Sequence, residues 1–180
     1  TDMVQAIRAL QDEIEASGAT DADYDVPYTT LHVGRIEGGT ALNIVPNTCT
    51  FLFEIRNLAT EAAEVIFERL QAQAEAIAAR HHKAFPQARI ELEVTNRYPA
   101  LDTEPTEDVV RFVKSLAAQN ATMKVAFGTE GGLFSETLGL PTVVCGPGSM
   151  DQGHKPDEFL SVDQLLRCDA MLDRLLGALQ

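Results

Sequence analysis

The run Asn47-Thr-Cys-Thr-Phe-Leu-Phe-Glu-Ile-Arg56 alternates between apolar and polar side chains. Successive side chains of a β-strand point to opposite faces, so one face carries Cys49, Phe51, Phe53 and Ile55. Such an apolar face is stable only when another element covers it. The run therefore predicts a half-buried strand, with Cys49 buried beside the two phenylalanines.

A partner strand precedes this run. Residues 29–37 alternate in the same way, with Leu31 and Val33 on one face, and Gly38-Gly39 ends them. Two such segments joined by a short connection favour an antiparallel pair. We therefore expect the strands that hold Val33 and Phe53 to lie side by side.

Two helices are predicted to cover the pair. Residues 1–17 and 60–82 carry apolar side chains at helical spacing, and residues 89–95 alternate again as a third strand. The resulting order, α-β-β-α-β, becomes the ferredoxin-like βαββαβ unit when one strand is placed in front. Residues 1–98 are therefore expected to form a ferredoxin-like α+β domain that lacks its first strand.

The remainder, residues 99–180, follows an α/β pattern. Helices are predicted at 106–119, at 131–139 and from a capping box at Ser161 and Gln164 onward, and short apolar strands at 124–127 and 141–145. Two short strands do not make a sheet that stands alone. This part is therefore expected to be the C-terminal segment of a larger α/β domain.

Composition restricts the partners and the compartment. The 180 residues carry a formal net charge of −13, which argues against a nucleic-acid or anionic-membrane partner. No apolar run approaches the roughly 18 residues of a membrane span, and no signal peptide is visible. The three cysteines, Cys49, Cys145 and Cys168, have no CxxC spacing, which is typical of a reduced, cytoplasmic protein.

His154 is the first candidate for a metal ligand. It lies in a glycine-rich loop after the strand predicted at 141–145, and α/β folds build sites from such loops. Neutral imidazole binds zinc, and Asp157 or Glu158 is placed to orient it. An ordinary surface-loop histidine is the alternative that the residues leave open.

Three further features are candidates for binding a substrate. The loop Gly128-Thr-Glu-Gly-Gly132 precedes a helix, whose N-terminus favours an anion, and a tight strand-to-helix turn is the alternative. Within it, Glu130 is either an acid–base group or a plain loop carboxylate. Arg56 is suited to hold a carboxylate through two hydrogen bonds, or to form a surface ion pair. Asn43 is either a substrate-binding residue or an ordinary turn asparagine.

Several segments together resemble acetylornithine deacetylase, in the zinc amidohydrolase family that also includes succinyl-diaminopimelate desuccinylase and carboxypeptidase G-type enzymes. The resemblance extends over essentially all 180 residues. The segments, in the family's order and spacing, are Thr29-Thr-Leu-His-Val-Gly-Arg-Ile-Glu-Gly-Gly39, Ala41-Leu-Asn-Ile-Val-Pro46, Phe53-Glu-Ile-Arg56, Gly128-Thr-Glu-Gly131 and Cys145-Gly-Pro-Gly-Ser-Met-Asp-Gln-Gly-His-Lys-Pro-Asp-Glu158.

The resemblance implies a two-domain subunit. A catalytic α/β domain holds two zinc ions, for which cobalt can substitute, and a ferredoxin-like lid mediates homodimerisation. Residues 1–98 then correspond to the lid, and residues 99–180 to the C-terminal segment of the catalytic domain. His154 matches a metal ligand of the family. The positions that match substrate-binding residues are Asn43, Arg56, Thr129, Glu130 and Gly131.

The implied activity is hydrolysis of N-acetyl-L-ornithine to L-ornithine and acetate in arginine biosynthesis, with an N-acyl amino acid as the small-molecule partner. The family's other ligands and its general base belong to His-x-Asp and Glu-Glu motifs, which do not occur in this sequence. No catalytic residue is therefore assigned within this chain, and the chain alone is expected to be inactive. The alternatives are a non-catalytic dimerisation or amino-acid-binding module, or a related deacylase, aminoacylase or desuccinylase.

Overall fold

The structure is a computed structural model that describes residues 1–153 and 155–180. The chain divides into two compact units. The first comprises Thr1–Ala100 and Lys124–Gly128, and the second comprises Leu101–Met123 and Thr129–Gln180. The assignment of residues 1–98 to a lid and of 99–180 to a catalytic domain stays a prediction.

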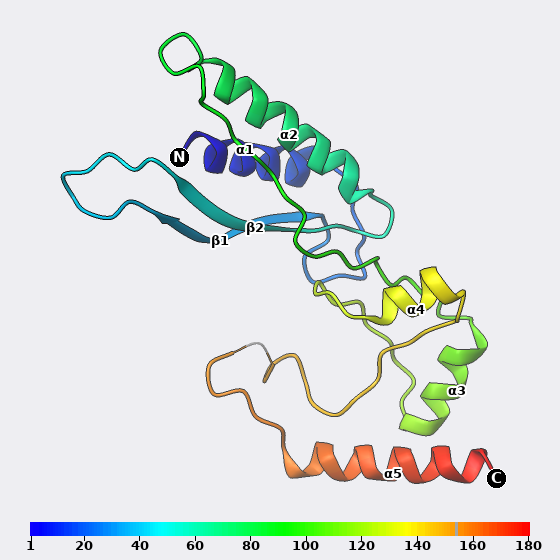
Figure 1. The fold of residues 1–180 in the computed structure, drawn as a ribbon. Coiled ribbons are helices and arrows are strands. Elements are labelled where there is room, and N and C mark those ends of the chain that lie inside the picture. Colours follow the sequence, from blue (N-terminus) through cyan, green and yellow to red (C-terminus); the bar gives the residue numbers. More distant parts are fainter. Residues whose placement is uncertain (154) are drawn as a thin grey trace. The chain divides into compact units, whose positions relative to one another are not determined.

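The first unit begins with a helix, two strands and a second helix (Figure 1). These are α1 (Asp2–Ser17), β1 (Thr30–Gly38), β2 (Cys49–Arg56) and α2 (Ala63–Ala79).

The two strands pair antiparallel, as predicted, and Val33 lies opposite Phe53. One extra residue, Gly34, lies between the paired residues Val33 and Arg35 and forms a bulge in β1. A bulge of this kind bends a strand and increases its twist.

Both helices cover the same face of this hairpin (Figure 1), which confirms the predicted cover. Phe51, Phe53 and Ile55 of β2 pack against the buried apolar cluster, which includes side chains of both helices. Burial of each large apolar side chain stabilises the fold by about 1.5–3 kcal/mol. The core cluster consists of Met3, Ile7, Leu10, Ile14, Leu31, Ile66, Leu70, Ala74 and Ile77.

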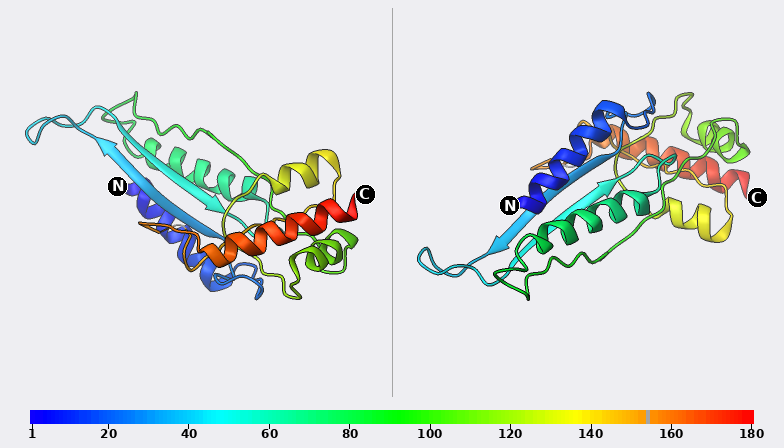
Figure 2. Two further views of the ribbon diagram at one scale, coloured as in Figure 1. Left: turned by 90° about the horizontal axis from the view of Figure 1, so that it is seen from below. Right: turned by 90° about the horizontal axis from the view of Figure 1, so that it is seen from above.

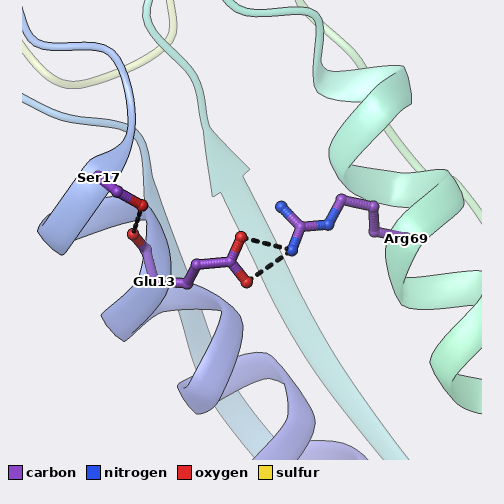
Figure 3. A network of polar contacts seen from close by, with 3 residues as sticks. All are labelled: Glu13, Ser17 and Arg69. Carbon is purple, nitrogen blue, oxygen red and sulfur yellow. Dashed lines mark hydrogen bonds and ion pairs between the residues drawn. The ribbon is translucent and has the colours of Figure 1, made fainter.

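One ion pair joins the two helices across their outer surfaces (Figure 3). Arg69 Nη2 of α2 donates to both carboxylate oxygens of Glu13 of α1, at 2.8 and 2.7 Å. Ser17 Oγ donates to the Glu13 carbonyl oxygen at 3.0 Å within α1. Because both charged side chains are about half exposed, the pair contributes at most about 1 kcal/mol. The apolar core, rather than this pair, holds the helices together.

Residues 89–95 do not form the predicted third strand. Ile90 and Leu92 do pack against the core cluster, but the segment has no backbone ladder. A strand needs a neighbour for its hydrogen bonds, and the described residues form only one two-stranded sheet, β1 with β2. The fold is therefore mixed α and β with a small antiparallel sheet, and the ferredoxin-like arrangement is not confirmed.

Cys49 is exposed, contrary to the prediction. It is the first residue of β2 and pairs with Gly38, where the hairpin loop at 39–48 extends beyond the two helices (Figures 1 and 2). The alternating pattern identifies the face of a side chain correctly, but it does not tell where along the strand the covering helices end.

The second unit contains three helices within its described residues. They are α3 (Asp108–Ala117), α4 (Gly131–Leu138) and α5 (Val162–Ala178). The helices α3 and α5 pack together, and Arg174 of α5 donates a hydrogen bond to the carbonyl oxygen of Leu116. Ser161 Oγ accepts from the Gln164 amide at 3.3 Å and caps α5 where the sequence predicts its start.

The strands predicted at 124–127 and 141–145 do not form, so only the helices of the pattern predicted for 99–180 are present in its described part. A side-chain contact takes the place of a ladder at Thr142, whose carbonyl oxygen accepts from Thr103 Oγ1. Strands this short need further strands and an apolar cover to be stable. No described helix has the length and apolarity to cross a membrane.

Replacement of Leu70 by Ala should destabilise the first unit by about 2–5 kcal/mol, because its side chain is 0% exposed at the centre of the core cluster and a cavity would remain. The measurement is native-state hydrogen exchange of α2 amides, which reports on opening of this unit. Leu52→Ala, on the exposed face of β2, is the control and should change stability by less than about 0.5 kcal/mol. Equal effects of the two substitutions would contradict the core described above.

Candidate functional site

Asn43 lies in the turn of the β1–β2 hairpin loop. The Ile44 amide donates to the Ala41 carbonyl oxygen at 3.2 Å, so Leu42 and Asn43 form the centre of a turn. Asparagine is favoured at such positions because its short polar side chain tolerates turn conformations. The turn is apolar around it, with Leu42 and Val45 exposed by 106% and 89%. The loop therefore presents one amide among uncovered apolar side chains.

Arg56 is the last residue of β2, and its guanidinium already has two partners. Nη1 donates to the Ala126 carbonyl oxygen at 3.0 Å, and Nη2 lies 2.9 Å from Glu54 Oε1. A guanidinium has five N–H donors, so these two contacts leave others for a ligand. The surface ion pair that the sequence left open is thus present, together with a contact that the sequence did not predict.

The residues Lys124–Gly128 form what we call the return segment, because they rejoin the first unit after α3. Lys124 Nζ lies 2.8 Å from Asp21 Oδ2 and 5.5 Å from the centroid of the Tyr24 ring. The Tyr98 ring lies against Gly128, 3.7 Å from where a Cβ atom would be. These contacts hold the return segment on the first unit.

The hydrogen bond from Lys124 lowers the pKa of the Asp21 carboxyl below its ordinary value of 3.8, and the Asp23 amide acts in the same direction. Desolvation opposes this shift but is the smaller influence. A carboxyl with a lowered pKa contributes stability above about pH 3.8, and the contribution disappears as the pH falls through the folded-state pKa.

Thr129, Glu130 and Gly131 belong to the second unit, at the start of α4. Thr129 Oγ1 accepts from the Gly131 amide at 3.1 Å, and the Glu130 carbonyl oxygen accepts from the Leu133 amide at 3.0 Å. Leu101 and Val144 pack closely against Gly131, which explains the need for a small residue. The loop is therefore a turn that leads into α4, and the strand predicted before it does not form. The role of these residues in binding stays a prediction.

His154 lies outside the described residues, so its predicted role as a metal ligand stays a prediction. Asp157 and Glu158, suggested to orient it, are exposed, and Asp157 adopts a left-handed backbone conformation with φ of 59°. Within residues 1–153 and 155–180, no three His, Cys, Asp or Glu side chains lie close enough together to hold a metal ion. The described residues alone do not build a metal centre.

Asn43 and Arg56 do not lie together in the first unit. The strand β2 is eight residues long, and at roughly 3.3 Å per residue its two ends are about 23 Å apart. Asn43 lies beyond its first residue and Arg56 is its last. One small substrate cannot touch both side chains of a single chain.

Sequence reasoning missed Asp21, Tyr24 and Lys124. Asp21 and Lys124 are 103 residues apart. Asp21 lies in an acidic loop, Lys124 lies at the start of a short apolar segment, and neither segment contains a recognisable motif. No local signal in the sequence identifies such a pair, because only the tertiary fold brings its members together.

Replacement of Lys124 by Met should raise the pKa of the Asp21 carboxyl towards 3.8, because its main hydrogen-bond donor is removed. The measurement is a carboxyl carbon NMR titration of the wild-type chain and the variant. Arg35→Gln removes the exposed Arg35–Glu37 pair of the same unit and is the matched control, which should leave the Asp21 titration unchanged. An unchanged Asp21 pKa in the Lys124 variant would contradict the geometry.

Comparison with known proteins agrees with the resemblance found in the sequence. Residues 1–82 match the family described as the peptidase dimerisation domain. Acetylornithine deacetylase of Myxococcus xanthus is 36% identical over 157 residues, which are 87% of this chain and 40% of that protein. The Pasteurella multocida acetylornithine deacetylase is 32% identical over 157 residues, covering 87% of this chain and 39% of that protein. The chain thus spans about two fifths of the length of these relatives.

These matches cover the hairpin, its two helices and most of the second unit. Residues 1–82 thus match the peptidase dimerisation domain family, and most of the chain is similar to a part of the acetylornithine deacetylases.

Proposed function

We propose that the chain is part of a zinc amidohydrolase that hydrolyses N-acetyl-L-ornithine to L-ornithine and acetate in the cytoplasm, as a step of arginine biosynthesis. The support comes from the relatives, which are named acetylornithine deacetylase and are 32–36% identical over 87% of the chain. In this proposal, residues 1–98 are the lid and residues 99–180 are the C-terminal segment of the catalytic domain. A related deacylase, aminoacylase or desuccinylase would differ in the acyl group or the amino acid.

The separation of Asn43 from Arg56 is the structural observation that best supports a substrate site shared between two subunits. Both positions match residues that reach the substrate in the family, but in one chain they lie at opposite ends of β2. A homodimer formed through the dimerisation domain resolves this conflict, because one subunit supplies Arg56 and the other supplies Asn43. The exposed apolar side chains of Leu42 and Val45 fit this role, since insertion into a second copy would bury them.

The proposed substrate offers a partner for each charged candidate. Its α-carboxylate suits the guanidinium of Arg56, which retains free donors beside its contacts with Glu54 and Ala126. The side-chain ammonium of ornithine suits the carboxylate of Glu130, because the charges are opposite. Thr129 and Gly131 shape the turn that carries Glu130. The substrate of a desuccinylase has an anionic acyl group, which the carboxylate of Glu130 would repel.

Metal chemistry belongs to the complete enzyme in this proposal. The residues described here do not provide a metal-binding cluster, so the two zinc ions would need ligands beyond them, with His154 as this chain's contribution. The described residues of this chain therefore bind and orient the substrate and form the dimer. A non-catalytic dimerisation or amino-acid-binding module would use the same residues without any dependence on metal.

Replacement of Arg56 by Ala in the complete enzyme should reduce transition-state binding by roughly 2–4 kcal/mol, because a charge-assisted contact with the substrate is lost. The measurement is kcat/KM for acetate release from N-acetyl-L-ornithine. Arg35→Ala, on the neighbouring strand, removes an exposed arginine paired with Glu37 and is the control that should leave kcat/KM unchanged. An unaltered kcat/KM in the Arg56 variant would count against the assignment.

The 180-residue chain by itself should release no acetate from N-acetyl-L-ornithine, even with excess Zn²⁺ or Co²⁺. A two-metal centre needs several ligands and their supporting hydrogen bonds, and the described residues supply no such cluster. The assay compares the purified chain with the complete enzyme, with and without a chelator. Metal-dependent turnover by the chain at a rate near that of the complete enzyme would overturn this expectation.

A further inference from the structure

The return segment is anchored to the rest of the first unit at every second residue. Lys124 binds Asp21 through its side chain, Ala126 accepts from Arg56 through its carbonyl oxygen, and Gly128 lies against Tyr98. The three contacts therefore attach the segment at its first, third and fifth residues, one through a side chain and two through the backbone. The next residue in the chain is Thr129, the first residue of the loop proposed to bind the substrate.

We propose that Asp21 and Lys124 are positioning residues, which fix the start of the Thr129–Gly131 loop by anchoring the return segment to the first unit. This inference rests on the proposed function of that loop and adds two residues to it. Neither side chain needs to touch the substrate. Their effect passes along the backbone, because Gly128 and Thr129 are directly bonded.

The contact between Asp21 and Lys124 has the properties of an anchor rather than of a solvated surface pair. Each side chain is only 26% exposed, whereas most ion pairs of the described chain are formed by side chains about half exposed or more. The Tyr24 ring lies under the ammonium group and limits its movement. A partly buried pair is also screened less by salt than an exposed one.

The anchor is separate from the core that stabilises the unit. The buried cluster of α1, α2 and β1 contains neither Asp21 nor Lys124. Loss of the ion pair should therefore release the return segment without unfolding the helices. This separation makes a positioning role distinguishable from a general effect on stability.

The first experiment is hydrogen–deuterium exchange of the 180-residue chain. The Asp21 and Tyr24 amides donate to the carbonyl oxygens of Pro27 and Asp21 in the loop that holds the anchor. In Lys124→Met and in Asp21→Asn, the amides of this loop should exchange about tenfold faster or more, while α2 amides keep their rates. The double variant should behave like Lys124→Met alone, because that variant already removes the ion pair with Asp21. Lys124→Arg should restore protection, and Arg35→Gln, which removes the Arg35–Glu37 pair, should have no effect. Unchanged exchange of the Asp21 and Tyr24 amides in both single variants would overturn the anchor.

The second experiment is steady-state kinetics of the complete enzyme with N-acetyl-L-ornithine. Lys124→Met should lower kcat/KM about tenfold and lower the melting temperature far less than Leu70→Ala does, and Lys124→Arg should recover most of the lost kcat/KM. A normal kcat/KM in Lys124→Met overturns the positioning role, even if exchange shows that the anchor exists. If the wild-type enzyme does not act on this substrate, the proposed function fails, while the exchange experiment still decides whether the anchor is present.

Discussion

Burial of one face of the β1–β2 hairpin under α1 and α2 is the constraint on which the rest of the first unit depends. A two-stranded sheet is marginal in water by itself, and here two helices shield its apolar side chains from solvent. The same packing determines where each functional candidate lies. It leaves the hairpin loop with Asn43 uncovered at one end, and it leaves Arg56 at the other end, next to the return segment.

Periodicity was sufficient to predict this core. The alternation around Phe53 and the helical spacing of residues such as Ile7 and Leu70 are local properties of the sequence, and each is preserved in the structure. The three remaining predicted strands failed for one shared reason. Strand formation depends on a neighbour that accepts and donates backbone hydrogen bonds, and a sequence pattern carries no information on whether that neighbour is at hand. Ile90 and Leu92 show the distinction, because they pack as predicted and still form no ladder.

The candidate site was predictable to a smaller extent. The family resemblance selected Arg56, Asn43 and the Thr129–Gly131 loop, and the structure adds what each of them contacts within its own unit. The structural alternatives that the sequence left open are both present: Arg56 forms a surface ion pair, and Asn43 occupies a turn position. Neither alternative excludes a role in binding. The Arg56 guanidinium has further N–H donors, and the turn fixes the backbone that carries the Asn43 side-chain amide. The contacts of Lys124 could not be foreseen, since they depend on chain segments far apart in the sequence.

The return segment also has a consequence for the order of folding. The contact between Asp21 and Lys124 spans 103 residues, whereas the Glu13–Arg69 contact between α1 and α2 spans 56. The entropic cost of loop closure rises with the length of the loop, and contacts between distant residues form slowly for that reason. Once the intervening helices have folded, the flexible length between the two partners shortens and that cost falls. We therefore expect the hairpin core to form first and the return segment to dock onto it afterwards.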